Sequence, residues 1–241
     1  MKKLFLLTFL LYFALPVFTQ ENAELYILPQ YREEIKSLVA NKQIETAFQW
    51  IEDQDSVTLA DHILLTEIEA PPFQEEKRAN QLKLMLEQAG ADSVWIDEVG
   101  NIIALRKGKI GGKTVALDAH MDTVFPEGTD VTVKIKNDTL FAPGIGDDTR
   151  GLAMLITILR AMNQHNIDTE ADVLFIGTVG EEGLGDLRGV KHLFSEKGPG
   201  IDSWISIDGG QIGRVNNKAL GSHRYKVSFK GQGGHSWGAF G

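Results

Sequence analysis

The chain has 241 residues, of which 24% are charged and 43% are hydrophobic, and its formal net charge is −9. This composition is that of an ordinary globular protein with room for one sizeable domain and part of a second. The acidic excess argues against nucleic acid or an anionic membrane as a partner, and the absence of cysteine excludes disulfides, thiolate metal sites and cysteine nucleophiles.

Residues 1–20 have the pattern of an export signal. Lys2 and Lys3 precede a nearly continuous apolar run, Leu4–Phe18, and polar residues follow it. The run is short for a membrane span. We therefore expect a signal peptide over residues 1–20, export of the chain to the periplasm or the medium, and no membrane anchor after cleavage. Residues 21–56 then have the spacing of an amphipathic helical segment.

Helical patterns alternate with short apolar runs through the middle of the chain. In chain order, we expect helices over 60–69, 75–88 and 151–163, and strands over 93–96, 101–105, 114–117, 173–176 and 204–207. Strands that alternate with helices predict an α/β fold with a mixed, largely parallel sheet flanked by helices. In such sheets, binding sites form beyond the carboxyl ends of the strands.

The pattern changes near residue 215. Tyr225, Val227 and Phe229 alternate with polar residues, which is typical of a half-exposed antiparallel strand. We expect residues 57–214 to form the main domain and residues 215–241 to begin a second domain. A segment of this length is too short to bury a core of its own.

Several polar residues lie where this fold places its sites. His120 with Asp122, Glu181–Glu182 and Asp208 each follow a short apolar run, and Asp147 lies in a glycine-rich turn before a helix. Imidazole and carboxylate groups bind zinc and similar cations. One carboxylate can bridge two cations, and a carboxylate that is not a ligand can accept a proton from water. The pattern predicts a two-metal hydrolytic site.

Each of these clusters also has an ordinary structural interpretation. The His120 segment can form a surface turn, and Asp147 or Asp148 can cap the following helix. Glu181–Glu182 can be an exposed acidic turn, and Asp208 can be a plain turn residue. A helix cap needs only one of the two adjacent aspartates. The functional interpretation is supported only when all of the clusters are considered together.

Taken together, the clusters resemble the M20 metallopeptidase and amidohydrolase family, which includes glutamate carboxypeptidases, tripeptide aminopeptidases and aminoacylases. The resemblance covers about residues 57–241. In family order, the matching segments are Ile68–Glu76, Asp97–Ala104, His120–Val124, Gly146–Gly151, Glu181–Gly183, Asp208–Gly210 and Gly234–Ser236. The resemblance implies a zinc-exopeptidase-like fold with an inserted α+β lid domain.

The resemblance also implies a set of metal ligands. His120 and Asp208 would bind one ion, Glu182 would bind a second, and Asp147 would bridge the two. Asp147 is chosen over Asp148 because it keeps the family spacing to the glycine that follows. The implied cofactors are two divalent ions, most often Zn²⁺, with Co²⁺ or Mn²⁺ as alternatives.

Three further residues receive catalytic roles from the resemblance. Asp122 would orient His120, and Glu181 would be the general base for a water that bridges the two ions. His235 in the lid would hold the substrate or its oxyanion. The family has a further metal-binding histidine beyond the lid, and this sequence has none after His235, so we expect a chain truncated within the lid.

The implied reaction is hydrolysis of amide bonds in small peptides by an exopeptidase, with a homodimer formed through the lid. Two alternatives stay open: an N-acyl amino acid deacylase of the same family, and a truncated form that binds metal or ligand without turnover. The G-x-S-x-G pattern at Gly234–Gly238 is typical of serine hydrolases, but no acid and histidine follow Ser236 as that fold requires.

Overall fold

The structure is a computed structural model that describes residues 27–210, 213–221, 225, 227–231, 233–234 and 237. Its contacts divide the chain into two units, Met1–Asp208 and Gly209–Gly241. The expected signal peptide and His235 lie outside the described residues. Among the described residues, no helix combines the length and the apolar character needed to cross a bilayer.

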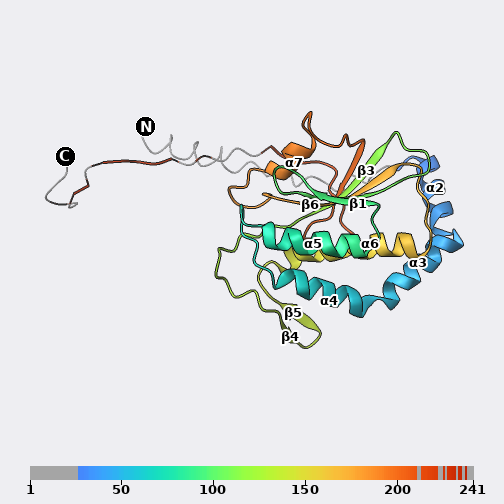
Figure 1. Cartoon of the computed structure of the whole chain (residues 1–241), viewed down its shortest axis with the longest axis horizontal. Coiled ribbons are helices and arrows are strands. Elements are labelled where there is room, and N and C mark those ends of the chain that lie inside the picture. The colour runs from blue at the N-terminus through green and yellow to red at the C-terminus, as the bar shows by residue number, and fades with distance from the viewer. Residues whose placement is uncertain are drawn as a thin grey trace, which may run out of the picture. The chain divides into compact units, whose positions relative to one another are not determined.

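The first unit is built around a five-stranded sheet with the strand order β1-β2-β6-β3-β7 (Figure 1). The strands are β1 (Ser93–Ile96), β2 (Ile102–Arg106), β3 (Thr114–His120), β6 (Asp172–Thr178) and β7 (Ser203–Ser206). β3 runs parallel to β6 and to β7, whereas β2 is antiparallel to β6 and β1 is antiparallel to β2. The predicted mixed sheet with flanking helices is confirmed.

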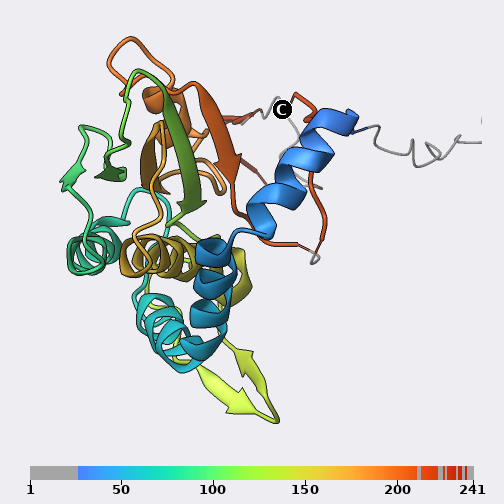
Figure 2. The same ribbon diagram turned by 90° about the vertical axis from the view of Figure 1, so that its right-hand side faces the viewer.

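One face of the sheet carries the main hydrophobic core. α5 (Glu76–Gln88) and α6 (Arg150–Gln164) lie side by side on this face, and α3 (Lys42–Asp53) and α4 (Asp55–Thr66) pack outside them (Figure 2). On the opposite face, α7 (Arg188–Leu193) packs through Leu193 on a smaller cluster made by Ile103, Ala116, Leu174 and Ile176. The central strands are therefore apolar on both faces, as expected for buried parallel strands.

The N-terminal helical segment is divided into two helices. α2 (Pro29–Val39) ends at Ala40, and α3 begins after Asn41, whose side chain accepts a hydrogen bond from the backbone N–H of Gln43 (2.9 Å). This cap satisfies an N–H group that has no partner inside the new helix. Apolar spacing continues across the break, which is why the sequence predicted one uninterrupted segment.

The structure differs from the expected elements in three other places, one of which is α7, a short helix that was not predicted. A hairpin of β4 (Lys134–Lys136) and β5 (Thr139–Phe141) was not predicted; each of its strands has only three residues and is largely exposed. The strand expected around Tyr225 and Val227 is wrong, since residues 225 and 227–231 have no strand structure. The side chains of Tyr225, Val227 and Phe229 are exposed, so their apolar alternation does not mark a face buried against a core.

Candidate metal centre

The carboxyl ends of three strands bring the predicted ligands to one edge of the sheet. His120 is the last residue of β3, Glu182 follows β6, and Asp208 follows β7. Asp147 lies in η1 (Ile145–Thr149), the irregular turn that leads into α6. The approach of these residues follows from the parallel pairing of β3 with β6 and β7, as the sequence predicted.

Two groups of side chains at this edge have the spacing of metal ligands. His120, Asp147 and Glu182 place one ligand atom each within 4.8 Å of one another, and so do His120, Asp148 and Asp208. His120 is the member common to both groups. Because Nδ1 of His120 is engaged by a carbonyl oxygen, only Nε2 can bind an ion, and a centre with two ions would need one of the carboxylates as the shared ligand.

The orientation of His120 is fixed by a hydrogen bond inside the protein. Its ring is buried, and its Nδ1 lies 2.9 Å from the backbone carbonyl oxygen of Asp122. Because a carbonyl oxygen can only accept, Nδ1 carries the hydrogen. Nε2 then faces the carboxylates of Asp147 at 2.7 Å and Asp208 at 3.9 Å, which is how a histidine presents itself to a metal ion.

Asp122 connects His120 with the acidic turn at Glu181–Glu182. Its buried carboxylate accepts hydrogen bonds from the backbone N–H groups of Glu181 (3.1 Å) and Glu182 (2.8 Å). The nearest distance from this carboxylate to Nδ1 of His120 is 3.8 Å. Asp122 therefore orients His120 through its backbone carbonyl and holds the acidic turn through its side chain.

The adjacent acids Asp147 and Asp148 have different surroundings. The carboxylate of Asp148 is buried and accepts the backbone N–H groups of Gly151 (3.1 Å) and His120 (3.2 Å). Asp148 thus caps α6 and ties it to β3, whereas the side chain of Asp147 is 58% exposed. The peptide bond between them is cis. A Cβ on Gly151 would lie 2.4 Å from the Asp148 carboxylate, so this cap requires glycine.

Helix α4 supports the turn that carries Asp147. Nε2 of His62 lies 2.6 Å from the carbonyl oxygen of Ile145, and the hydroxyl groups of Thr66 and Thr149 are 2.7 Å apart. Sequence analysis gave these residues no role, because both contacts join positions 83 residues apart. His62 is therefore a structural partner of the candidate site.

Arg78 is a buried cation beside the site that the sequence analysis missed. Its guanidinium donates to the backbone carbonyls of Ile68 and Met121. Burial lowers its pKa to about 10, and the nearby Asp122 carboxylate acts in the opposite direction. The sequence did contain an indication of this. Arg78 lies on the same buried side of α5 as Leu82, and an arginine at a buried position normally has a polar partner.

Glycines and an ion pair shape the turn that carries Glu181–Glu182. Gly180 and Gly183 have φ values of +72° and +58°, in the left-handed region that favours glycine. Arg188 packs against Gly180, where an added Cβ would lie 2.2 Å from Nη1. The same guanidinium pairs with the buried carboxylate of Glu75 at 2.7 Å, so the turn is held on this side as well.

The site concentrates negative charge. Burial raises the pKa of Asp148 to about 8, and burial with neighbouring carboxylates raises the pKa values of Glu181 and Glu182. Burial acts to lower the pKa of His120, but the surrounding aspartates, first Asp148, raise it above its ordinary value. Several carboxylates around one imidazole form a donor set that divalent cations neutralise, so these residues fit a metal centre.

Comparison with known proteins matches this part of the chain to hydrolases. Residues 116–234 match the family described as peptidase family M20/M25/M40. A provisionally named LysW-lysine/LysW-ornithine hydrolase of Pyrococcus furiosus is 35% identical over 129 residues, which cover 54% of this chain and 35% of that protein. Carboxypeptidase G2 of a Pseudomonas species is 26% identical over 143 residues, which cover 58% of this chain and 34% of that protein.

A solved structure shares the same fold. Aminopeptidase PepT of Bacillus cereus superposes with a TM-score of 0.55 at 26% sequence identity, over 64% of this chain and 43% of that chain. The present chain spans about a third of the length of the curated relatives it matches.

Proposed function

We propose that the protein is a metal-dependent exopeptidase that hydrolyses amide bonds of small peptides. The proposal starts from the match of residues 116–234 to peptidase family M20/M25/M40. The observation that carries the proposal is the pair of ligand groups that share His120. A similar protein named as a carboxypeptidase and a similar structure named as an aminopeptidase support a peptide as the substrate.

The proposed ligands are those that the resemblance implied. His120 and Asp208 would hold one ion, Glu182 would hold the other, and Asp147 would be shared. The contacts of Asp148 support this choice, because both of its oxygens accept backbone N–H groups. We propose zinc, which accepts imidazole and carboxylate ligands. When bound, the two ions would acidify a water molecule and polarise the amide carbonyl.

Glu181 is the proposed general base. Burial raises the pKa of its carboxyl above the ordinary value, which moves its proton affinity toward that of a base working near neutral pH. The hydrogen bond from its backbone N–H to Asp122 fixes its position relative to His120. Its carboxylate takes a proton from water and returns it to the leaving amine.

Export and assembly are further parts of the proposal. The basic residues Lys2 and Lys3 with the apolar segment Leu4–Phe18 support export through a signal peptide. We also propose that His235 contributes to substrate binding and that the protein pairs with a second copy of itself. Both ideas derive from the resemblance to the family.

The proposal is tested by zinc content and peptide hydrolysis on the same samples. The whole chain is dialysed against zinc, its metal content is measured by elemental analysis, and it is assayed on dipeptides, tripeptides and N-acyl amino acids. Asp147→Asn is expected to lose bound zinc. Glu181→Gln is expected to keep its zinc and to lose about 10²–10⁴-fold in hydrolysis rate, the usual contribution of a general base.

The control is Asp172→Asn, which changes a carboxylate at the opposite end of the same sheet, where it accepts the N–H of Gly108. Its zinc content and activity should match those of the wild type. Hydrolysis of N-acyl amino acids but not of peptides would favour the deacylase. Zinc binding that survives Asp147→Asn, or hydrolysis that survives Glu181→Gln, would contradict the assigned roles.

A further inference from the structure

The segment Asp97–Ala104 matches the family pattern, yet neither the metal site nor the proposed reaction gives it a role. Asn101 in this segment is fully buried in the turn between β1 and β2. Its side-chain amide makes three hydrogen bonds: Oδ1 accepts the N–H of Val179 (3.1 Å), and Nδ2 donates to Asp97 (2.7 Å) and to the carbonyl of Gly189 (3.1 Å). One of these bonds stays within the turn, and the other two reach Val179 and Gly189 in a distant part of the chain.

Val179 and Gly189 are the two ends of the loop that carries Glu181–Glu182. The N–H of Gly189 donates to the carbonyl of Val179 (3.0 Å), which closes residues 180–188 into a loop. Asn101 bonds to both ends of this closure, so it joins the point where the loop leaves β6 to the point where α7 begins. The fit is close, because a Cβ on Gly189 would lie 2.2 Å from Oδ1 of Asn101.

Asn101 is itself held by a rigid turn. One carboxylate oxygen of Asp97 accepts the backbone N–H groups of Val99, Gly100 and Asn101 at 3.0, 2.9 and 2.9 Å. The other oxygen accepts from the Asn101 side chain, which fixes which amide atom faces each partner. The β1–β2 turn therefore fixes the orientation of the Asn101 side-chain amide, which bonds to both ends of the loop that carries Glu181 and Glu182.

We propose that Asn101 is a positioning residue that sets the placement of Glu181 and Glu182 by fixing both ends of their loop. This inference rests on the proposed function, since it concerns the general base and one metal ligand. Asp122 fixes the middle of the loop through the two backbone N–H groups, and Asn101 fixes its ends. Groups that bind metal or transfer protons require such support from neighbouring residues.

The chain contains a close chemical match for a control. Asn163, near the C-terminal end of α6, also accepts one hydrogen bond through Oδ1, from Arg106 (2.8 Å), and donates two through Nδ2, to the carbonyls of Ala89 and Gly90 (2.9 Å each). It ties segments together at the opposite end of the sheet from the candidate metal centre. Asn101→Ala and Asn163→Ala thus delete the same side chain and the same number of bonds at two places.

Two readouts are measured on the whole chain: hydrogen exchange of backbone amides followed by mass spectrometry, and zinc affinity by calorimetric titration. In Asn101→Ala, exchange should rise across residues 179–189, and zinc affinity should fall by about 10–100-fold, as for the loss of a residue that supports metal ligands. In Asn163→Ala, exchange should rise near residues 87–91 instead, and zinc affinity should stay as in the wild type.

Gly189→Ala provides a second test that leaves the asparagine in place. Its Cβ would push against Oδ1 of Asn101 and against the backbone of Val179, so it should raise exchange in the same loop and lower zinc affinity in the same way. It also keeps the inference testable if Asn101→Ala does not fold. The double variant Asn101→Ala/Gly189→Ala should change exchange and zinc affinity little more than either single variant, because both substitutions disturb the same contact.

The inference is overturned if exchange across residues 179–189 is unchanged in Asn101→Ala and Gly189→Ala, or if Asn163→Ala lowers zinc affinity equally. A wild-type chain that binds no zinc would contradict the metal centre but not the loop, because the exchange measurement stands without metal. For active protein, the kcat of Asn101→Ala should fall while KM stays near the wild-type value. Because partial unfolding also lowers the apparent kcat without changing KM, kcat is calculated per folded, zinc-loaded chain, from the folded fraction and the zinc content of the same sample.

Discussion

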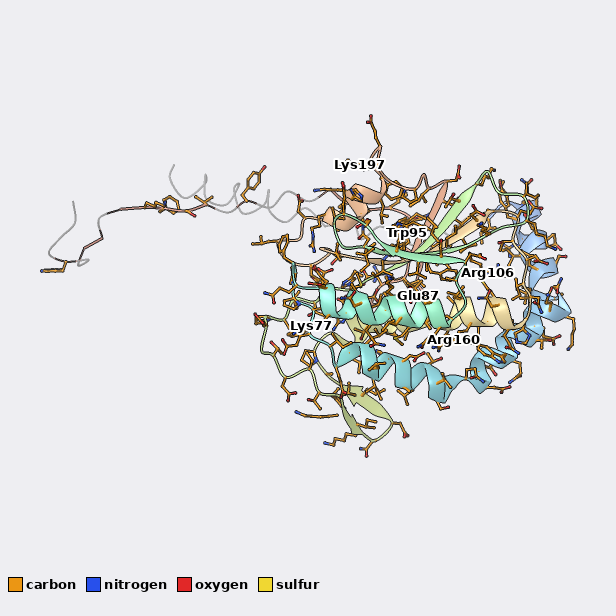
Figure 3. The ribbon with its side chains drawn as sticks, viewed as in Figure 1. Lys77, Glu87, Trp95, Arg106, Arg160 and Lys197 are labelled. Atoms are coloured by element: carbon orange, nitrogen blue, oxygen red, sulfur yellow. The ribbon has the colours of Figure 1, made fainter. Side chains whose placement is uncertain are left out.

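At each end of the five-stranded sheet, side-chain hydrogen bonds join neighbouring segments, but the two ends bury different groups. At the carboxyl ends of β3 and β6, several ionisable side chains are buried; they are Arg78, Asp118, His120, Asp122 and Asp148. At the opposite end, Arg106, labelled in Figure 3, donates a hydrogen bond to Asn163 of α6, and both side chains remain partly exposed. One end therefore buries ionisable groups, and the other keeps its polar groups partly exposed.

This difference shows where stability and function compete within one fold. Burying a charge is costly unless it is paired and hydrogen-bonded. The contacts at the far end serve only to join elements, so partial exposure is no disadvantage there. The candidate site tolerates the cost because its carboxylates must converge on His120, and residues of several segments share the task of holding them in place. Such a site is expected to lower the stability of the metal-free chain.

The strongest test of this comparison replaces one arginine at each end. Arg78→Met leaves the buried Asp122 carboxylate without its nearby cation and leaves two backbone carbonyls without a donor. We expect a loss of about 3–5 kcal/mol in the free energy of unfolding, as for a broken buried charge pair. Arg106→Met removes hydrogen bonds to Asn163 and Ile167 and should cost about 1.5 kcal/mol.

Urea unfolding of the two arginine variants measures both values. The slope of the transition should be the same in each variant, which would show that stability has changed and the compactness of the unfolded chain has not. Equal losses in the two variants would mean that the buried charges of the site end have no special energetic weight.

A second test uses pH on the metal-free chain. The pKa of Asp148 is raised from 3.8 to about 8 by burial, so between these values the folded chain binds more protons than the unfolded chain. Stability must then fall as pH rises through this window. The raised pKa of His120 acts in the same direction, because its protonated form is favoured in the folded state and is lost as pH rises.

We expect the thermal unfolding midpoint in a chelator to be higher at about pH 5.5 than at about pH 8. Asp148→Asn should flatten this dependence, whereas Asp172→Asn at the opposite end should leave it as in the wild type. A midpoint that rises with pH in the wild-type chain would contradict the assigned environment of Asp148.

The smallest effect is expected from a surface pair near the far end of the sheet. Lys109 contacts Asp168 at 2.7 Å, but their side chains are 68% and 57% exposed. Lys109→Ala should therefore change the free energy of unfolding by less than about 0.5 kcal/mol. A larger loss in calorimetry would show that solvent-exposed contacts at this end contribute more than the comparison assumes.

The sequence predicted those helices and strands whose buried residues recur with a regular hydrophobic period. Apolar runs located the central strands, and helical spacing located α5 and α6, because burial imposes a regular period on the residues that face a core. The approach of His120 to Asp147 and Glu182 followed from the parallel strands and the family resemblance. The hairpin and α7 were missed, since short or exposed elements impose no such period.

The supporting contacts were less predictable than the ligands. Nothing in the spacing of residues indicates that Asn101 reaches Gly189, or that the Asp122 side chain holds the acidic turn while its carbonyl orients His120. The choice of Asp147 over Asp148 rested on the family spacing to Gly151 alone. The backbone N–H groups that Asp148 accepts could not be predicted, because they depend on how α6 meets β3.

The contacts that build the site join distant parts of the chain. His120 and Asp147 are 27 positions apart, Asp122 and Glu182 are 60 apart, and Asn101 and Gly189 are 88 apart. Such contacts form only after long loops have closed, which makes them slow steps of folding. During synthesis on the ribosome, the four proposed ligands are not all present until Asp208 has been made. Metal is therefore expected to enter a sheet that has already formed, and not to guide the early chain.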